Sequence, residues 1–161
     1  MTRMEMEMLI SSDLRERAKI FAKSIPNEPG IYIAQPIGSR MRVIDKSRAH
    51  IMPSVNNSYI KVGKAESLSS RSKNYFFDND GDIMFKPIIL SKNMSSAQLK
   101  DLEKMLKSAF FDFRIINPKT NRILEWMTNI SCEEAELVIK DTYKKFLQII
   151  ENETNLNSNP K

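Results

Sequence analysis

The segment from Ser95 to Phe113 constrains the fold most, because its apolar residues recur with helical spacing. They are separated by 3, 4, 4 and 3 residues and comprise Leu99, Leu102, Leu106, Phe110 and Phe113. A helix with one apolar face buries that face against another element, and short alternating runs such as 59–62 are typical of strands. The sequence therefore predicts an α+β domain: a small sheet flanked by helices.

Shorter elements surround this helix. Strands are expected over residues 31–34, 59–62 and 84–90, and the last carries Pro87, which favours a sheet edge or a bulge. Helices are expected over 67–77 and from a capping box at 131–134 to about residue 150, with 123–127 extended. Near the N-terminus, Ser11, Ser12 and Asp13 are N-cap types before a helical pattern that stops at Pro26. We expect an N-terminal helical extension over 1–28, one domain over 29–150 and a flexible tail over 151–161.

Composition excludes several classes of protein. One cysteine, Cys132, rules out a disulfide framework within the chain, and one histidine, His50, rules out a metal site built from several histidines. No uncharged apolar run approaches the ~18 residues of a spanning helix, and the methionine-rich start is interrupted by charges, unlike a signal peptide. We therefore expect an intracellular, cytoplasmic protein with no membrane partner.

Positive charge is concentrated in the middle of the chain. The formal net charge is +5, but residues 30–122 alone hold sixteen Lys or Arg against eight Asp or Glu. Such a basic segment is compatible with binding a polyanion and equally with a solvated basic surface.

Two expected strands carry polar side chains that share a face. Strand alternation allows Tyr32, Tyr59 and Lys61 to cluster there if the strands pair, although Lys61 is equally compatible with a solvent-facing position. Arg71 follows on the next helix, with Tyr75 one turn further on. A phenol held near such cations can have its pKa lowered and accept a proton from water.

Glu103 is the carboxylate of the 95–113 helix closest to its apolar stripe. It falls about 40° from Leu99, at the margin of the buried face. A carboxylate there requires a cation or a metal ion. The spacing leaves open an ion pair with Lys107 or Lys100, or a Mg²⁺ ion, which one or two carboxylates can hold together with water and phosphate oxygens.

These residues occur in an order that resembles the GIY-YIG nuclease superfamily. The first motif is Gly30-Ile31-Tyr32, and Tyr59-Ile60-Lys61-Val62-Gly63 resembles the second as it stands in the K-[IV]-G branch of phage-associated proteins and small restriction endonucleases. Arg71 and Glu103 match the family arginine and metal-binding glutamate in position. The run 124–127 resembles an E-W-[FM] element, in which we favour a structural role for Glu125.

The resemblance implies a three-stranded mixed or antiparallel sheet and an endonuclease that hydrolyses DNA. By carry-over, Tyr32 is the general base or orients the water, Lys61 contacts it or the phosphate, Arg71 binds the scissile phosphate, and Glu103 holds Mg²⁺ (or Mn²⁺). Tyr75 stands where many members have histidine, and Tyr59 is a second candidate phenol. The chain departs from the family pattern in its second motif tyrosine and in this histidine.

The stretch between the two strand motifs, about 36–57, is long and basic. We interpret it as an inserted loop that reaches a DNA groove. The candidate DNA-binding residues are Arg40, Arg42, Lys46, Arg48, His50, Lys64 and Lys73. A palindromic target would favour a homodimer. Two alternatives stay open: a non-catalytic DNA-binding or interaction protein on a degenerate nuclease fold, and a nuclease directed at RNA.

Overall fold

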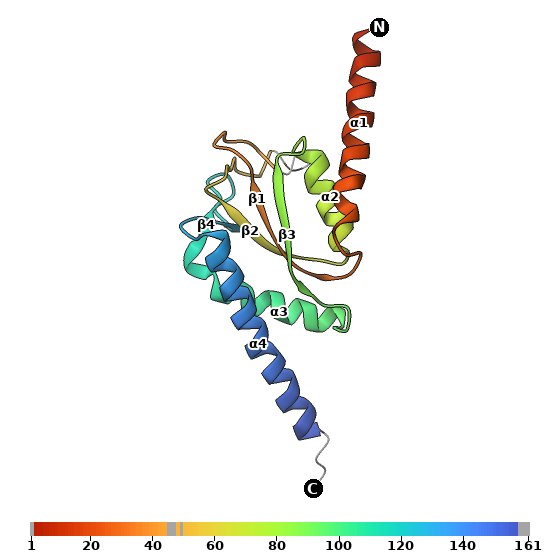
Figure 1. Cartoon of the computed structure of the whole chain (residues 1–161). Coiled ribbons are helices and arrows are strands. Elements are labelled where there is room, and N and C mark those ends of the chain that lie inside the picture. The colour runs from red at the N-terminus through yellow and green to blue at the C-terminus, as the bar shows by residue number, and fades with distance from the viewer. Residues whose placement is uncertain (1, 45–47, 49, 158–161) are drawn as a thin grey trace.

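The computed structural model is an α+β arrangement with one antiparallel sheet between two layers of helices (Figure 1). It describes residues 2–44, 48 and 50–157. The strands are β1 (Gly30–Pro36), β2 (Ile60–Ala65), β3 (Ile83–Leu90), β4 (Arg114–Ile116) and β5 (Ile123–Met127), in the order β3-β1-β2-β5-β4. The helices are α1 (Arg3–Lys23), α2 (Leu68–Asp78), α3 (Ser96–Ala109), the 3₁₀ turn η2 (Phe111–Phe113) and α4 (Cys132–Asn157).

The expected three-stranded sheet is too small, because β5 and β4 extend it to five strands. The helix expected over 95–113 is shorter in the structure, because α3 ends at Ala109 and a 3₁₀ turn follows over Phe111–Phe113. β4 has only three residues, too few for an alternating pattern to be recognised. Outside these strands, Arg42 and Val55 form an isolated antiparallel bridge.

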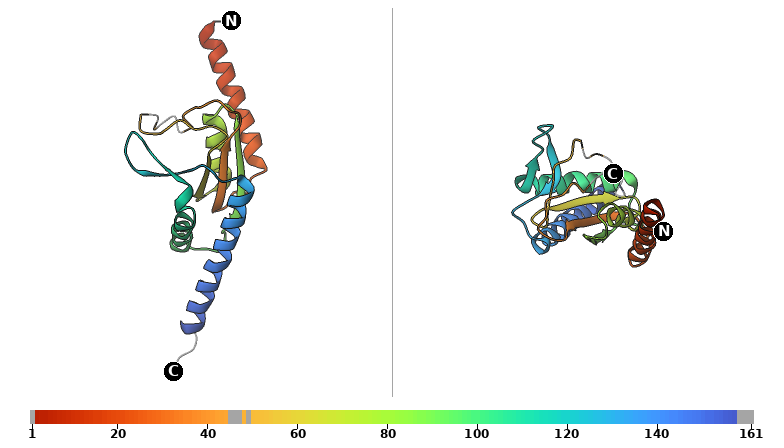
Figure 2. Two further views of the ribbon diagram at one scale, coloured as in Figure 1. Left: turned by 90° about the vertical axis from the view of Figure 1, so that its left-hand side faces the viewer. Right: turned by 90° about the horizontal axis from the view of Figure 1, so that it is seen from above.

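β1 lies at the centre of the sheet's longer strands, and its alternation separates two cores. Ile31 and Ile33 point toward α3 and α4, where Leu99, Leu102 and Ile139 complete the larger cluster. Tyr32 and Ala34 point to the other face, together with Leu68 of α2 and Phe85 of β3. The sheet therefore has α1 and α2 on one side and α3 and α4 on the other, as the views in Figure 2 show.

Pro87 lies where its missing N–H is tolerated. β3 is an edge strand, and its register against β1 shifts between the partners of Ile31 and Tyr32, which are Ile89 and Pro87. The sequence-based prediction of an edge or a bulge is confirmed, since both occur at this residue.

The helix boundaries differ from expectation at both ends of the chain. α1 begins eight residues before Ser11, because Thr2 and Glu5 form a capping box that satisfies the first backbone N–H groups. At the other end, Ser131 accepts from the Glu134 N–H at 3.0 Å, and α4 continues past Ile150 to Asn157.

The outer halves of α1 and α4 extend beyond the sheet in opposite directions (Figures 1 and 2). The last turns of α1 are anchored, because Ala18 is buried and the Phe21 ring packs 4.8 Å from that of Phe76. Within the residues described here, no helix combines the length and apolarity needed to cross a membrane.

Candidate functional site

Tyr32 is completely buried beneath the site. Its ring stacks on Phe85 with centroids 4.6 Å apart and lies across Gly63, its antiparallel partner on β2. Its hydroxyl forms a hydrogen bond of 3.1 Å with the Tyr75 hydroxyl. Burial, followed by the neighbouring Tyr75, raises the pKa of Tyr32, and the opposing charges of Lys61 and Arg71 do not cancel this rise. The expected lowering of its pKa by cations is therefore wrong.

Three of the other predicted residues, Lys61, Arg71 and Tyr75, line an open cavity of about 350 Å³, here called the basic cavity. Its lining residues are Ile44, Arg48, Met52, Lys61, Arg71, Asn74, Tyr75, Asp78, Ile123, Leu124, Glu125 and Trp126. The Lys61 ammonium lies 5.6 Å from the centre of the Tyr75 ring, and Arg71 lies one helical turn before Tyr75. No carboxylate of the described residues lies within 4 Å of the Arg71 guanidinium, so this group is available to an anion from outside.

The cavity also has an apolar wall beside its cations. Trp126 is paired directly with Lys61 between β2 and β5, so both side chains lie on one face of the sheet. Trp126 and Ile44, which both line the cavity, are buried. A ligand entering here meets both positive charge and apolar surface.

A series of ion pairs connects this cavity to Glu103 on the opposite side of the sheet. Lys61 lies 3.4 Å from one oxygen of Glu125, and Lys107 lies 3.9 Å from the other. Lys107 also lies 3.6 Å from Glu103, whose side chain is 18% exposed. Of the partners left open by the sequence, the structure contains the pair four residues apart, with Lys107.

Glu125 can reach both sides because β2 and β5 separate next to it. Their pairing comprises only Ile60 with Met127 and Lys61 with Trp126. Glu125 lines the basic cavity and also a smaller pocket of about 20 Å³, to which Glu103 and Lys107 contribute. Tyr75, Lys61 and Arg71 thus lie on the α2 face, whereas Glu103 lies on the α3 face, outside the basic cavity, and is connected to it only through Lys107 and Glu125.

The two glutamates fit the oxygen ligands that Mg²⁺ prefers. Both approach the single Lys107 ammonium, so a positive charge between them is already favourable. Residues 2–44, 48 and 50–157 contain no cluster of three or more His, Cys, Asp or Glu side chains placed to bind a metal. Two carboxylates completed by water and phosphate oxygens therefore describe the metal site that these residues could form.

The candidate DNA-binding residues do not form one surface. Arg48 lines the basic cavity, Lys73 is exposed on α2, and Arg40 and His50 are exposed in the 36–57 segment. Lys64 is three residues after Lys61 on β2, so strand alternation puts it on the opposite, α3 side of the sheet. Lys46 lies outside the described residues.

Arg42 contacts the protein itself. Its guanidinium donates to the backbone oxygens of Asn79 and Asp82 and lies 3.6 Å from the Asp82 carboxylate. Its side chain is only 21% exposed, so it holds its own part of the chain against the turn after α2.

Tyr59 does not join Tyr32 and Lys61 as the alternation predicts. β2 begins only at Ile60, and Tyr59 closes a turn through its N–H bond to the Asn56 oxygen. Its ring packs in the cluster that contains Val55 and Trp126, outside the lining of the basic cavity.

The sequence left open the ion pair between Glu103 and Lys107, which the structure contains. It did not predict that Glu125 also approaches Lys107. Nothing local indicated that Glu125 would enter the gap between two separating strands.

No protein-family model, curated protein or solved structure matches the chain at a significant level. The function is therefore inferred from the geometry of the described residues.

Proposed function

We propose that this protein is a divalent-metal-dependent endonuclease that hydrolyses DNA phosphodiester bonds. One observation carries the proposal: Arg71, Lys61 and Tyr75 line a single cavity, and ion pairs through Glu125 and Lys107 connect it to Glu103. These residues come from four separate elements. Together they supply a guanidinium that has no carboxylate within 4 Å among the described residues, a phenol, and two carboxylates that approach the same Lys107 ammonium.

Arg71 and Lys61 bind the phosphate in this proposal. A guanidinium offers two parallel N–H donors to phosphate oxygens, and it stabilises the charge that develops on them during attack by water. Lys61 adds a second positive charge from the floor of the cavity. The apolar wall at Trp126 and Leu124 accommodates the sugar or base next to that phosphate.

Tyr75, rather than Tyr32, is the phenol that contacts the reacting groups. Tyr75 lines the cavity, whereas Tyr32 is sealed behind it and remains protonated because its pKa is raised. The bond between their hydroxyls fixes the orientation of Tyr75. Tyr75 therefore orients the attacking water, and Tyr32 is a positioning residue.

Glu103 would hold the metal ion, with Glu125 as the second carboxylate. A bound Mg²⁺ would supply Lewis-acid stabilisation of charge on the phosphate. The Lys107 ammonium, which lies near both carboxylates, marks the place where such a positive charge is favourable.

Incubation with supercoiled plasmid tests the proposal. Wild-type protein is expected to nick or linearise the plasmid with Mg²⁺ or Mn²⁺ and to leave it intact with chelator. Glu103→Ala is expected to abolish cutting, and Asp101→Ala, a matched change on the exposed side of the same helix, is expected to retain it. Cutting by folded Glu103→Ala, or its persistence in chelator, contradicts the assignment.

Two observations favour a second candidate function, a DNA-binding protein without catalysis. Tyr32 is inaccessible, and Glu103 already has Lys107 as its counter-ion. This alternative predicts salt-dependent binding of DNA and no cutting with any divalent ion. Competing DNA and RNA substrates in the same assays distinguish either function from one directed at RNA.

A further inference from the structure

A second open groove lies on the other side of α2, and the proposed function does not use it. It has a volume of about 340 Å³ and is here called the α1–α2 groove. It is lined by Arg15, Ala18, Lys19, Lys73, Asn74, Phe77 and Asp78. Because α1 precedes both strand motifs in the chain, nothing in the resemblance assigns it a role.

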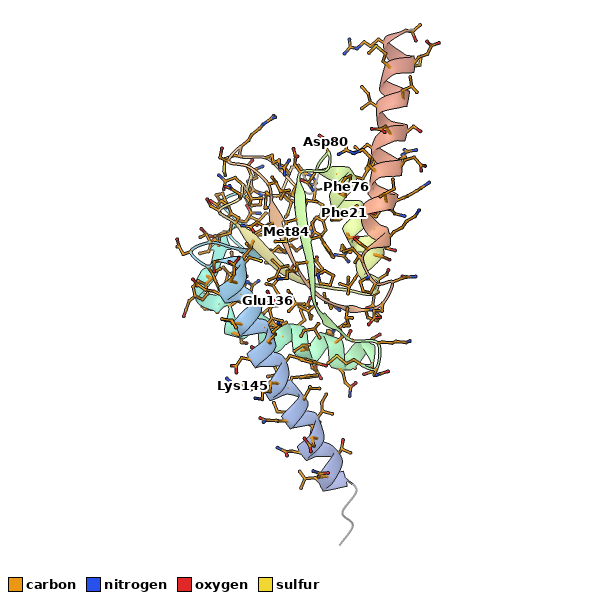
Figure 3. All side chains as sticks on the ribbon, viewed as in Figure 1. Phe21, Phe76, Asp80, Met84, Glu136 and Lys145 are labelled. Atoms are coloured by element: carbon orange, nitrogen blue, oxygen red, sulfur yellow. The ribbon has the colours of Figure 1, made fainter. Side chains whose placement is uncertain are left out.

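The groove is built on a fixed contact between the two helices. The Phe21 ring packs 4.8 Å from the Phe76 ring, and Figure 3 shows the two side chains facing each other between α1 and α2. Ala18 is buried in the same contact. The Arg15 guanidinium lies 5.7 Å from the centre of the Phe77 ring. The aromatic ring therefore holds this charge at the margin of the groove.

The charged side chains of the groove are mostly positive. The groove is lined by three basic side chains, those of Arg15, Lys19 and Lys73, and by one acidic side chain, that of Asp78. Lys19 pairs with Glu16 at 3.2 Å, but both side chains are well exposed, so water screens this pair. In the part of the chain that the structure describes, no carboxylate lies within 4 Å of Arg15 or Lys73.

The α1–α2 groove adjoins the basic cavity. Asn74 and Asp78 line both, so one ridge of α2 separates them. Arg71 lines the basic cavity, and Lys73, two residues further along α2, lines the α1–α2 groove. Phosphates of one DNA strand recur every ~3.4 Å along the duplex axis, so neighbouring phosphates of one strand can contact cations on both sides of this ridge.

We propose that the α1–α2 groove binds the phosphodiester backbone of the DNA next to the segment held in the basic cavity. This inference rests on the proposed function for the identity of the ligand. It makes α1 part of the DNA-binding surface, with Arg15 and Lys19 as backbone contacts. Such contacts carry no sequence specificity but contribute to affinity in proportion to the counterions they release.

Equilibrium binding to a ~30-base-pair duplex at several salt concentrations tests the inference. The variant Arg15→Glu/Lys19→Glu/Lys73→Glu is compared with Lys92→Glu/Lys100→Glu/Lys144→Glu, which changes exposed lysines elsewhere and gives the same net charge. We expect the first variant to reduce the slope of log K against log salt by about 2–3, and the control to leave it nearly unchanged. If the Glu variant unfolds, the corresponding Gln substitutions in both sets give the same comparison.

Equal slopes for the two variants overturn the inference. An Arg71→Ala variant measured in parallel keeps this result separate from the proposed function. If Arg71→Ala weakens binding while the two triple variants behave alike, the basic cavity binds DNA and the groove does not. If the wild-type protein binds no DNA at all, both proposals fail.

Discussion

Gly63 is constrained by the Tyr32 ring rather than by its own backbone conformation. A Cβ atom at this position would lie 2.6 Å from the Tyr32 hydroxyl oxygen and 2.8 Å from the ring carbon that bears it. The final glycine of the second motif therefore makes room for the tyrosine of the first.

Gly63→Ala is expected to destabilise the protein by ~1–3 kcal/mol, because the buried ring must shift from a packed position. The effect should nearly vanish in a Tyr32→Leu background, where the ring is absent. Urea denaturation of the four proteins of this cycle measures the coupling. An equal penalty in both backgrounds would contradict the packing described here.

Tyr32 is expected to make stability depend on alkaline pH. Burial raises its pKa, so the folded state retains a proton that the unfolded state releases above pH ~10. Stability should therefore fall by up to ~1.4 kcal/mol per pH unit above that value. Denaturation between pH 8 and 11 should show this loss for the wild type and a smaller one for Tyr32→Phe. Identical profiles for the two proteins would show that Tyr32 does not cause the loss.

At the scale of single elements, α3 depends on its N-terminal cap. The Ser95 hydroxyl accepts from the Gln98 N–H at 3.1 Å, and the Gln98 side chain accepts from the Ser95 N–H at 3.0 Å. Ser95→Ala should cost ~1 kcal/mol in thermal or urea unfolding. Ser96→Ala, one residue into the helix, should have little effect, and similar losses in both variants would argue against a specific cap.

Arg42 connects the chain between β1 and β2 to the turn after α2. Its bonds to the turn after α2 involve a charged donor in a mostly buried position, so Arg42→Ala should destabilise the protein by ~1.5–3 kcal/mol. The exposed neighbour provides the control, and Arg40→Ala should stay within ~0.5 kcal/mol of wild type. Unchanged stability of Arg42→Ala, with weakened DNA binding, would return this arginine to the DNA-binding surface.

The sequence predicted those elements whose pattern is local. The apolar stripe from Leu99 to Phe110 predicted α3 and the position of Glu103 at the margin of its buried face. Pro87 predicted that β3 is an edge strand or contains a bulge. The β4–β5 extension of the sheet could not be predicted in the same way. β4 is very short, and β5 pairs with a strand more than sixty residues earlier in the chain.

At the scale of the whole molecule, the site depends on the ion pairs that connect the two faces of the sheet. The sequence could predict that Tyr32, Lys61 and Arg71 lie close together, because they belong to three consecutive elements, two paired strands and the helix that follows them. It cannot predict that Glu125 would bridge the faces, since that depends on where β2 and β5 separate. For the same reason, the burial that raises the pKa of Tyr32 became visible only once α2 and β3 covered it.

In the proposed function, the two faces of the sheet have different roles. The α2 face, with Arg71, is expected to bind DNA, and the α3 face, with Glu103, is expected to hold the metal ion. Loss of Arg71 should therefore weaken both binding and cutting, whereas loss of Glu103 should weaken cutting alone.

Measuring DNA affinity and single-turnover cleavage on the same preparations tests this most directly. We predict that Arg71→Ala and Glu103→Gln each slow cleavage by at least ~10²-fold, and that only Arg71→Ala loses affinity for DNA. Wild-type cleavage by Glu103→Gln, or wild-type affinity in Arg71→Ala, would show that the two faces do not form one site.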